Sequence, residues 1–133
     1  MTSTEEQVLD TAAALVASFA GGDLDAYFGH FARDAVFVFN TTPGVLGSVD
    51  AYRDEWAGWE RDAGFRVLSC VSSEQRVQQM GPVAVFTHRV RTRVATHDGE
   101  EDLRERETIV FQLKEDGRWI AVHEHLSPDP STD

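Results

Sequence analysis

The sequence predicts an α+β fold in which three N-terminal helices pack on a curved antiparallel or mixed β-sheet. Apolar residues recur at the 3.6-residue spacing of amphipathic helices in the N-terminal half of the chain. From Phe65 onwards this spacing gives way to the alternation that is typical of strands. Glu115-Asp116-Gly117 separates two such alternating runs, which indicates a tight hairpin turn. Helices followed by strands favour a two-layer α+β domain.

The helices can be placed by their capping residues. Ser3 and Glu6 fit a capping box, in which the two side chains satisfy free backbone N–H groups at a helix start. Behind them one helical face carries Val8, Leu9, Ala12, Leu15, Val16 and Phe19. Gly21-Gly22 ends this helix, Asp23 is the expected N-cap of a shorter second helix, and a third helix is expected from Ser48.

The strands follow from β-branched and aromatic runs bounded by turn residues. The expected strands are 35–40, 65–79, 83–96 and the two halves of a closing hairpin within 106–127. The later strands are joined by short connections, so they should form an antiparallel meander. We expect a single domain over residues 1–127, followed by a polar, proline-rich and disordered tail at 128–133.

The composition limits the classes of function. A formal net charge of −11 argues against binding to nucleic acid or to an anionic membrane, because both require a basic patch. The single cysteine, Cys70, excludes an intrachain disulfide, and no apolar run approaches the roughly 20 residues of a membrane span. The N-terminus, MTSTEEQ, is acidic where a secretory signal would be basic. We therefore expect a cytoplasmic protein.

Five short motifs, in this order, resemble those of the nuclear-transport-factor-2-like superfamily. They are Gly22–Asp25, Phe31–Ala35, Gly47, Asp116–Trp119 and the closing His123-x-His125-x-Ser127. The last motif is most similar to the SnoaL-like branch and to the association domain of calcium/calmodulin-dependent kinase II. The resemblance implies a cystatin-like cone, in which a curled sheet and its helices surround a pocket. It does not imply one activity, because this superfamily hosts both enzymes and binding modules.

The resemblance also suggests which strand residues face the pocket. Aligned on the kinase association domain, the ligand-facing positions fall on His88, Val110 and Leu126. Because residues two apart on a strand share a face, the expected inner set is His88, Arg106, Thr108 and Glu124, with Phe86. The expected outer set is Arg89, Arg91, Trp119, His123 and His125. A single β-bulge would exchange these faces.

The inner set suits an apolar pocket with a polar tip. His88 and Glu124 are candidates for a general base and its orienting partner, which would make them the catalytic pair of an enzyme. Arg106 would bind a carboxylate or carbonyl oxygen of an apolar ligand, beside the hydroxyl of Thr108. The structural alternative is that Arg106 and Glu124 pair with each other and His88 bonds to a core hydroxyl.

Aromatic residues complete the candidate ligand-binding set. Tyr27, Phe39, Tyr52, Trp56 and Phe86 would form the apolar wall of the pocket, although a helical aromatic stripe is equally typical of plain core. No metal site is expected, because His123 and His125 lack a third ligand at a fixed spacing. No cofactor is expected either, since the sequence has no phosphate loop or dinucleotide fingerprint.

Two functions remain open at the level of sequence. One is a small-molecule-binding module without turnover. The other is a cofactor-free enzyme of the SnoaL-like kind, an isomerase, dehydratase or cyclase acting on a hydrophobic carbonyl compound or polyketide. The resemblance excludes the ketosteroid isomerase mechanism, because the positions of its tyrosine and aspartate hold Leu15 and Phe39.

A homodimer is expected as well. Both faces of the C-terminal strands carry apolar residues, and three short helices can cover only one of them. The expected interface lies on the sheet face away from the helices, with a core of Val85, Ile109, Phe111 and Trp119.

Overall fold

The computed structural model describes residues 3–131, with helices and strands in the predicted order. One strand lies between the second and third helices, the other four follow the third helix, and all five belong to one sheet. The elements are α1 (Thr4–Ala20), α2 (Leu24–Gly29), β1 (Phe31–Val38), α3 (Val49–Ala63), β2 (Arg66–Met80), β3 (Val83–Thr96), β4 (Gly99–Leu113) and β5 (Trp119–Pro128). The predicted boundaries of β3 agree with the structure at both ends.

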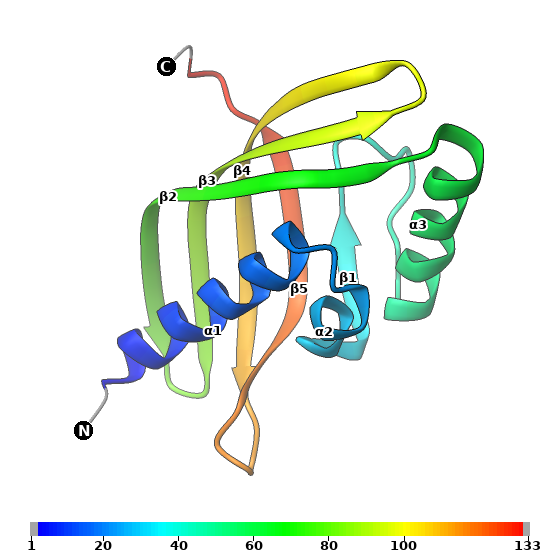
Figure 1. Cartoon of the computed structure of the whole chain (residues 1–133). Helices are drawn as coiled ribbons and strands as arrows, with labels where there is room; N and C mark the ends of the chain where they lie inside the picture. The colour runs from blue at the N-terminus through cyan, green and yellow to red at the C-terminus, as the bar shows by residue number, and fades with distance from the viewer. Residues whose placement is uncertain (1–2, 132–133) are drawn as a thin grey trace.

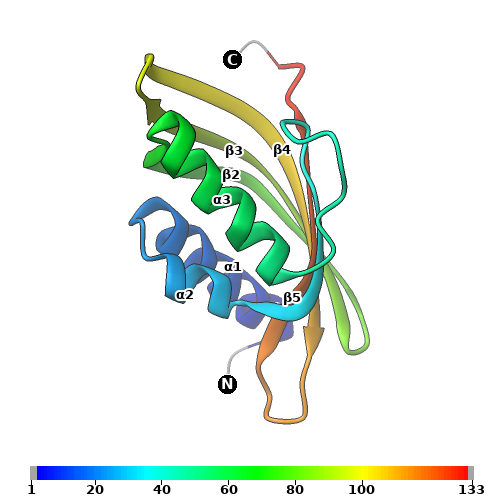
Figure 2. The ribbon, with the colours of Figure 1, turned by 90° about the vertical axis from the view of Figure 1, so that its right-hand side faces the viewer.

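The sheet has five strands in the order β1-β5-β4-β3-β2. Strands β2 to β5 form the predicted antiparallel meander, and β1 adds to its edge by pairing in parallel with β5. Figure 1 shows the long strands curving behind α1, and Figure 2 shows all three helices on the concave side of the sheet. The α+β fold, with helices covering one face of a curved mixed sheet, is thus confirmed.

Each helix starts at the predicted cap. The side chains of Ser3, Asp23 and Ser48 accept hydrogen bonds from the backbone N–H three residues later, at 3.1, 3.2 and 3.0 Å. Helix α3 ends at Gly64, whose φ of +66° is a left-handed conformation that favours glycine. These caps fix where α2 and α3 begin and so place one buried tyrosine on each, Tyr27 and Tyr52.

The core lies between the helices and the concave face, which we call the inner face of the sheet. Tyr27, Phe37, Phe86, Ile109 and Phe111 are among its largest fully buried side chains. Aromatic rings from α2, β1 and α3 pack around Tyr52: the Phe28 ring meets it edge to face, and the Phe37 ring is tilted against it. The helices therefore contribute an aromatic layer, whereas the sheet contributes both apolar and ionisable side chains.

The register of β3 and β4 corrects one prediction. A two-residue turn at His97-Asp98 pairs Thr96 with Gly99, so every even-numbered residue of β3 lies opposite an odd-numbered residue of β4. His88 consequently pairs with Glu107 and shares its face, while Arg106 is exposed on the opposite, outer face. The expectation that Arg106 and Thr108 face inward was wrong, because the resemblance assigned the inner face of β4 to the even-numbered residues.

A β-bulge corrects a second prediction. Val110 pairs with His123 and Phe111 pairs with Ala121, which leaves Val122 as an extra residue in β5. The bulge reverses the alternation, so Trp119 lies on the inner face before it and Glu124 lies on the inner face after it. Trp119 is 4% exposed and was wrongly placed outside, whereas Glu124 was correctly placed inside.

The expected dimer interface changes for the same reasons. Ile109 and Phe111 are fully buried under the helices within one chain, as is nearly all of Trp119. Only Val85 of the expected interface core lies on the outer face.

The first residues of the expected disordered tail are ordered in the structure. Strand β5 ends at Pro128, and the backbone N–H of Asp129 donates to the Arg104 carbonyl oxygen. Residues 132–133 lie outside the described residues, and the domain boundary stays a prediction.

No helix in residues 3–131 combines the length and the apolarity that crossing a bilayer requires.

Candidate functional site

A small cavity lies between α1 and the inner face of the sheet. Its volume is about 60 Å³. Its lining comes from all three helices and from β2, β3, β4 and β5: Leu15, Val16, Phe19, Tyr27, Tyr52, Cys70, Val90, Thr92, Glu105, Glu107, Glu124 and Leu126. A buried water needs roughly 10–15 Å³ of such space, so the cavity has room for a few waters or a small chemical group.

The wall of the cavity is divided by polarity. The apolar part is formed by Leu15, Val16 and Phe19 from α1, together with Val90 and Leu126 from the sheet. The polar part holds three carboxyl groups, two phenols, one thiol and one threonine hydroxyl. Val16, Phe19, Cys70 and Leu126 are only half-buried, so this end of the cavity lies near the surface. A ligand would therefore meet apolar contacts near the entrance and polar groups deeper inside.

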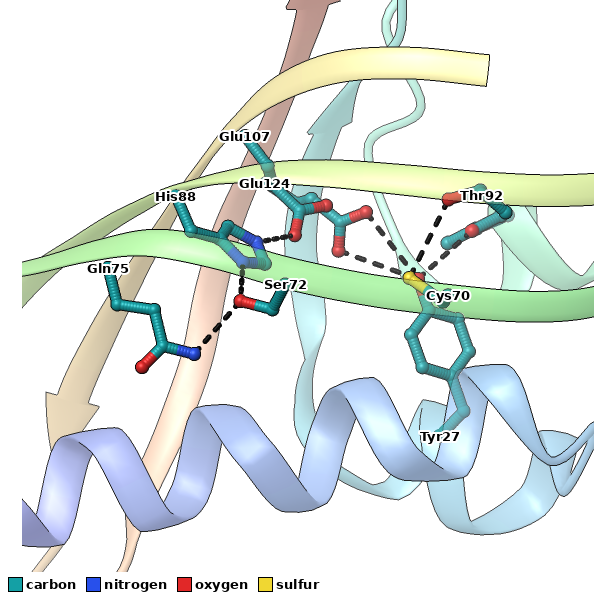
Figure 3. Close-up of polar contacts among 9 residues, drawn as sticks. Tyr27, Cys70, Ser72, Gln75, His88, Thr92, Glu107 and Glu124 are labelled. Carbon is teal, nitrogen blue, oxygen red and sulfur yellow. Dashed lines mark hydrogen bonds and ion pairs between the residues drawn. The ribbon is translucent and has the colours of Figure 1, made fainter. Parts of the chain in front are cut away.

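His88 lies immediately behind the polar wall, between two strands. Its Nε2 is 2.6 Å from the Glu107 Oε1 across the β3–β4 pair, and its Nδ1 is 2.5 Å from the Ser72 Oγ on β2. Gln75 donates to the same Ser72 oxygen at 2.9 Å. Figure 3 shows the imidazole held on both sides by these contacts. Both ring nitrogens of His88 are thus engaged, and its side chain is fully buried.

Glu124 continues this series on the other side of Glu107. The Glu124 carboxyl lies next to that of Glu107, and the Tyr27 hydroxyl donates to the Glu124 oxygens at 3.4 and 3.5 Å. The Tyr27 hydroxyl also lies 3.0 Å from that of Tyr52. One series of hydrogen bonds therefore runs from Ser72 through His88 to Glu107, and a second links Glu124 through Tyr27 to Tyr52. Figure 3 shows the first series and the contacts of Tyr27 with Glu124.

Burial alters the acidity of the groups on this wall. It raises the pKa of Glu124 well above the ordinary value, and the neighbouring Glu107 raises it further. Burial also raises the pKa of Glu105 to about 7, again with a contribution from Glu107, while a hydrogen bond from Asn40 acts in the opposite direction. The pKa of the Tyr27 and Tyr52 phenols is raised well above 10 by burial, then by the charge of Glu124. At neutral pH both phenols are therefore protonated, and burial favours the protonated form of the Glu124 carboxyl.

Cys70 also faces the cavity, but it is not a nucleophile at neutral pH. Burial raises the pKa of its thiol to about 11, although a hydrogen bond from Thr92 at 3.6 Å lowers it somewhat. Since the thiolate is the reactive form, Cys70 serves here as a small wall residue.

The structure brings some of the predicted site residues together. Tyr27, Tyr52 and Glu124 line the cavity, and His88 contacts it through Glu107. Phe39, Trp56 and Phe86 are buried in the adjoining core without lining it, and the Phe86 ring packs 4.6 Å from that of His88. Leu15, which the resemblance aligned with the isomerase tyrosine, does line the cavity.

Arg106 and Thr108 lie elsewhere. They line a wide, open groove on the outer face, together with Arg76, Arg89 and His125. Successive residues of β4 point to opposite faces, so the side chains of Arg106 and Thr108 point away from the cavity. The groove and the cavity nevertheless share Glu107, and His88 lines the groove as well.

Two site residues were missed by the sequence analysis. Glu105 and Glu107 were placed on the outer face, yet they are 7% and 9% exposed and form the centre of the polar wall. The signal for their true position was present in the sequence. A two-residue turn before Gly99 requires odd-numbered residues of β4 to share a face with His88.

The chemistry available at this wall is proton transfer and hydrogen bonding. Within residues 3–131, no set of three or more histidine, cysteine, aspartate or glutamate side chains has an arrangement that could hold a metal ion.

Comparison with known proteins agrees with the fold. The profile of the SnoaL-like domain matches residues 8–130. No curated protein matches the chain significantly in sequence. Among solved structures, a hub of calcium/calmodulin-dependent kinase II from S. rosetta superposes with a TM-score of 0.78 at 20% identity, over 97% of this chain and 99% of that one.

Two further structures are similar. An NTF2-like protein from Cytophaga hutchinsonii has a TM-score of 0.81 at 12% identity, over 96% of this chain and all of that one. A protein from Catenulispora acidiphila, solved in complex with S-DNPA, has a TM-score of 0.76 at 14% identity, over 92% and 91%. These identities establish the shared fold alone.

Proposed function

The chain belongs to the SnoaL-like domain family, and from that premise we propose that it binds a small molecule in the cavity beneath α1. The observation that carries the proposal is the divided wall, which is apolar near the surface and lined by carboxyl and phenol groups at depth. One structural neighbour carries a small ligand, which is in keeping with this use of the fold.

The size of the cavity limits the ligand. Pockets for drug-sized molecules measure roughly 300–1,000 Å³, whereas this cavity measures about 60 Å³. The site therefore takes a ligand of a few heavy atoms, or the polar end of a longer one. A polyketide would enter only if α1 moved away from β2.

The chemical group expected on the ligand must also be revised. The sequence-based expectation of a carboxylate or carbonyl depended on Arg106, which is exposed on the outer face. The polar end of the ligand instead meets Glu105, Glu107 and Glu124 and the two tyrosine hydroxyls.

The binding proposal is tested with 1-butanol, n-butylamine and butyrate, which match in length, using NMR on the full chain. Saturable shift changes are expected for the methyl groups of Leu15, Val90 and Leu126 with at least one probe. Val90→Phe should abolish them by filling the cavity. Val85→Phe places the same ring on the outer face of the same strand and should leave them unchanged.

The outcome that would overturn the proposal is equally direct. If none of the three probes gives a saturable change at these methyl groups, the chain does not use this cavity for small molecules. Binding that survives Val90→Phe but is lost in Val85→Phe would place the ligand on the outer face instead.

A second candidate function is a cofactor-free acid–base enzyme. The specific observation in its favour is the series formed by the hydrogen-bonded His88 and Glu107 and the adjacent Glu124 carboxyl, whose pKa burial raises well above its ordinary value. Such a series can deliver a proton to a carbonyl oxygen while a carboxylate removes one from the adjacent carbon. The reaction class would be isomerisation or dehydration of a small carbonyl compound.

The enzyme proposal is tested by hydrogen–deuterium exchange of 2-butanone in D2O. Catalysed enolisation would exchange the protons beside the carbonyl faster than buffer alone, and Glu124→Gln should remove the excess rate without unfolding the chain. An excess rate of zero, or one unchanged by Glu124→Gln, would leave binding as the function of the site.

We also propose that the chain self-associates through the outer face. Val85 and Val110 pair directly on this face, and both are only half-buried. Light scattering at micromolar concentration should show a dimer, and Val85→Glu should shift it to the monomer. A wild-type chain that is monomeric under these conditions would contradict the proposal.

A further inference from the structure

The polar wall of the cavity has an unusual balance of charge. Its ionisable groups are three carboxyls, two phenols and a thiol, and none of the described residues that line it is an arginine, lysine or histidine. The nearest cation-forming side chain is His88, whose two nitrogens are occupied by Ser72 and Glu107. A ligand inside the cavity therefore meets acceptors and acidic protons, but no fixed positive charge.

From this arrangement we propose that the cavity selects ligands whose polar end is a protonated amine. The inference rests on the proposed function, since it names the chemical class of ligand for the same site. A carboxylate ligand would face three carboxyl groups in a poorly solvated space without a compensating cation, which is unfavourable. An ammonium group brings the charge that the wall lacks.

The geometry of the wall also suits an ammonium group. Glu105 and Glu107 are two residues apart on β4 and share its inner face, while Glu124 is on the neighbouring strand, opposite Ile109. An ammonium group has three N–H donors and no acceptor, and this wall offers carboxyl oxygens from two adjacent strands. The apolar part of the ligand would pack against Leu15 and Val90.

The pH dependence of binding should distinguish an amine from a neutral ligand. Burial raises the pKa of Glu105 to about 7 and that of Glu124 well above its ordinary value. A cation placed beside these carboxyls favours their ionised forms, so binding of an amine should release protons near neutral pH. Its affinity should rise between pH 6 and pH 8, whereas that of a neutral ligand should not.

The phenols and the thiol that face Glu105 do not titrate in that interval. Tyr27 on α2 and Tyr52 on α3 have a pKa raised well above 10, and Cys70 on β2 has one of about 11. The remaining ionisable neighbours are Glu107 on β4 and, behind it, His88 on β3, which are held in a direct pair.

The test uses the same three probes on the full chain at pH 6, 7 and 8. We expect n-butylamine to bind roughly tenfold or more tighter than 1-butanol at pH 8, the scale of a charged hydrogen bond, and butyrate to bind weakest. Calorimetry in phosphate and in Tris, which differ in ionisation enthalpy, should show proton release for the amine alone. Glu105→Gln should reduce the preference for n-butylamine over 1-butanol.

Glu101→Gln is the matched control, because it removes the same charge from an exposed position on the same strand. If it reduces the amine preference as much as Glu105→Gln, the preference reflects the net charge of the protein and the inference fails. If 1-butanol or butyrate binds in the cavity at least as tightly as n-butylamine at pH 8, the inference fails while the proposed function stands. If no probe binds, both fail together.

Discussion

His88 and Glu107 lie directly opposite each other on β3 and β4, and 2.6 Å separates the imidazole Nε2 from the carboxylate Oε1. Both residues are at least nine-tenths buried, and the second imidazole nitrogen is occupied by Ser72. The pair joins two strands beneath the helices and connects to Glu124 at the cavity wall. It is therefore both a structural contact and the inner support of the candidate site.

Breaking this pair should destabilise the fold. Glu107→Gln replaces a carboxylate acceptor with a neutral amide, so the buried imidazole loses its charged partner. We expect the free energy of unfolding at pH 7 to fall by about 1.5–3 kcal/mol, measured by urea denaturation. Glu100→Gln is the control, because Glu100 pairs with Arg93 on the surface and should cost at most about 1 kcal/mol. Equal losses in the two variants would contradict a special role for the buried pair.

Stability should also depend on the pH through Glu105. Folding raises the pKa of this carboxyl from an ordinary value of about 4.5 to about 7, so the folded chain holds the proton more tightly than the unfolded chain. The resulting stabilisation is complete below pH 4.5 and is lost as the pH rises to about 7. Allowing for solvent screening, we expect the difference to be about 2 kcal/mol.

The variant Glu105→Gln isolates this contribution, since it cannot titrate. The free energy of unfolding of the wild type minus that of the variant should decrease from pH 4.5 to pH 7.5, whereas Glu101→Gln should show no such trend. A difference that stays constant over this interval would mean that folding does not change the pKa of Glu105.

The assignment of the strand faces can be checked by truncation. Phe111 is fully buried under the helices, so Phe111→Ala should lower the free energy of unfolding by about 3–5 kcal/mol. Val110→Ala, one residue earlier on the outer face, should cost far less. If Phe111→Ala instead changed the oligomeric state and left the stability of the monomer intact, the inward placement of Phe111 would be wrong.

Gly64 is expected to resist substitution. Its φ is +66°, and a Cβ at this position would lie 2.4 Å from the His97 ring. Gly64→Ala should therefore destabilise the chain by about 1–2 kcal/mol in thermal or urea unfolding. Gly29→Ala provides the contrast, because nothing lies within 4 Å of the added methyl group and Ala favours the helix. A neutral Gly64→Ala would show that this turn tolerates a side chain.

The fold was predictable because local signals agreed with one another. Ser3, Asp23 and Ser48 mark the helix starts through their own side chains, and these caps require no knowledge of distant residues. The faces of the strands were less predictable, since one residue of shift exchanges them. For β4 the two-residue turn at His97-Asp98 places the odd-numbered residues on the inner face, whereas the resemblance to the kinase association domain predicted the even-numbered ones.

The bulge at Val122 had no comparable local signal. Its neighbours alternate regularly in sequence, and only the pairing of β5 with β4 reveals that Ala121 and His123 flank an extra residue. The bulge brings Glu124 to the inner face while keeping Trp119 there. The inward position of Glu124 together with Trp119 thus depends on a feature of tertiary structure, whereas the inward position of Glu105 and Glu107 follows from the local turn before Gly99.

The position of β1 has a consequence for synthesis of the chain. Phe31–Val38 is made early, yet the strand beside it in the sheet is β5, which ends at Pro128. During synthesis on a ribosome, the backbone of β1 can pair with β5 only after β5 has emerged. Pairing between strands so far apart in the sequence is slow. A chain stopped at Leu113 should leave the amides of Val36 and Val38 open to solvent exchange, and protection there would contradict this order of assembly.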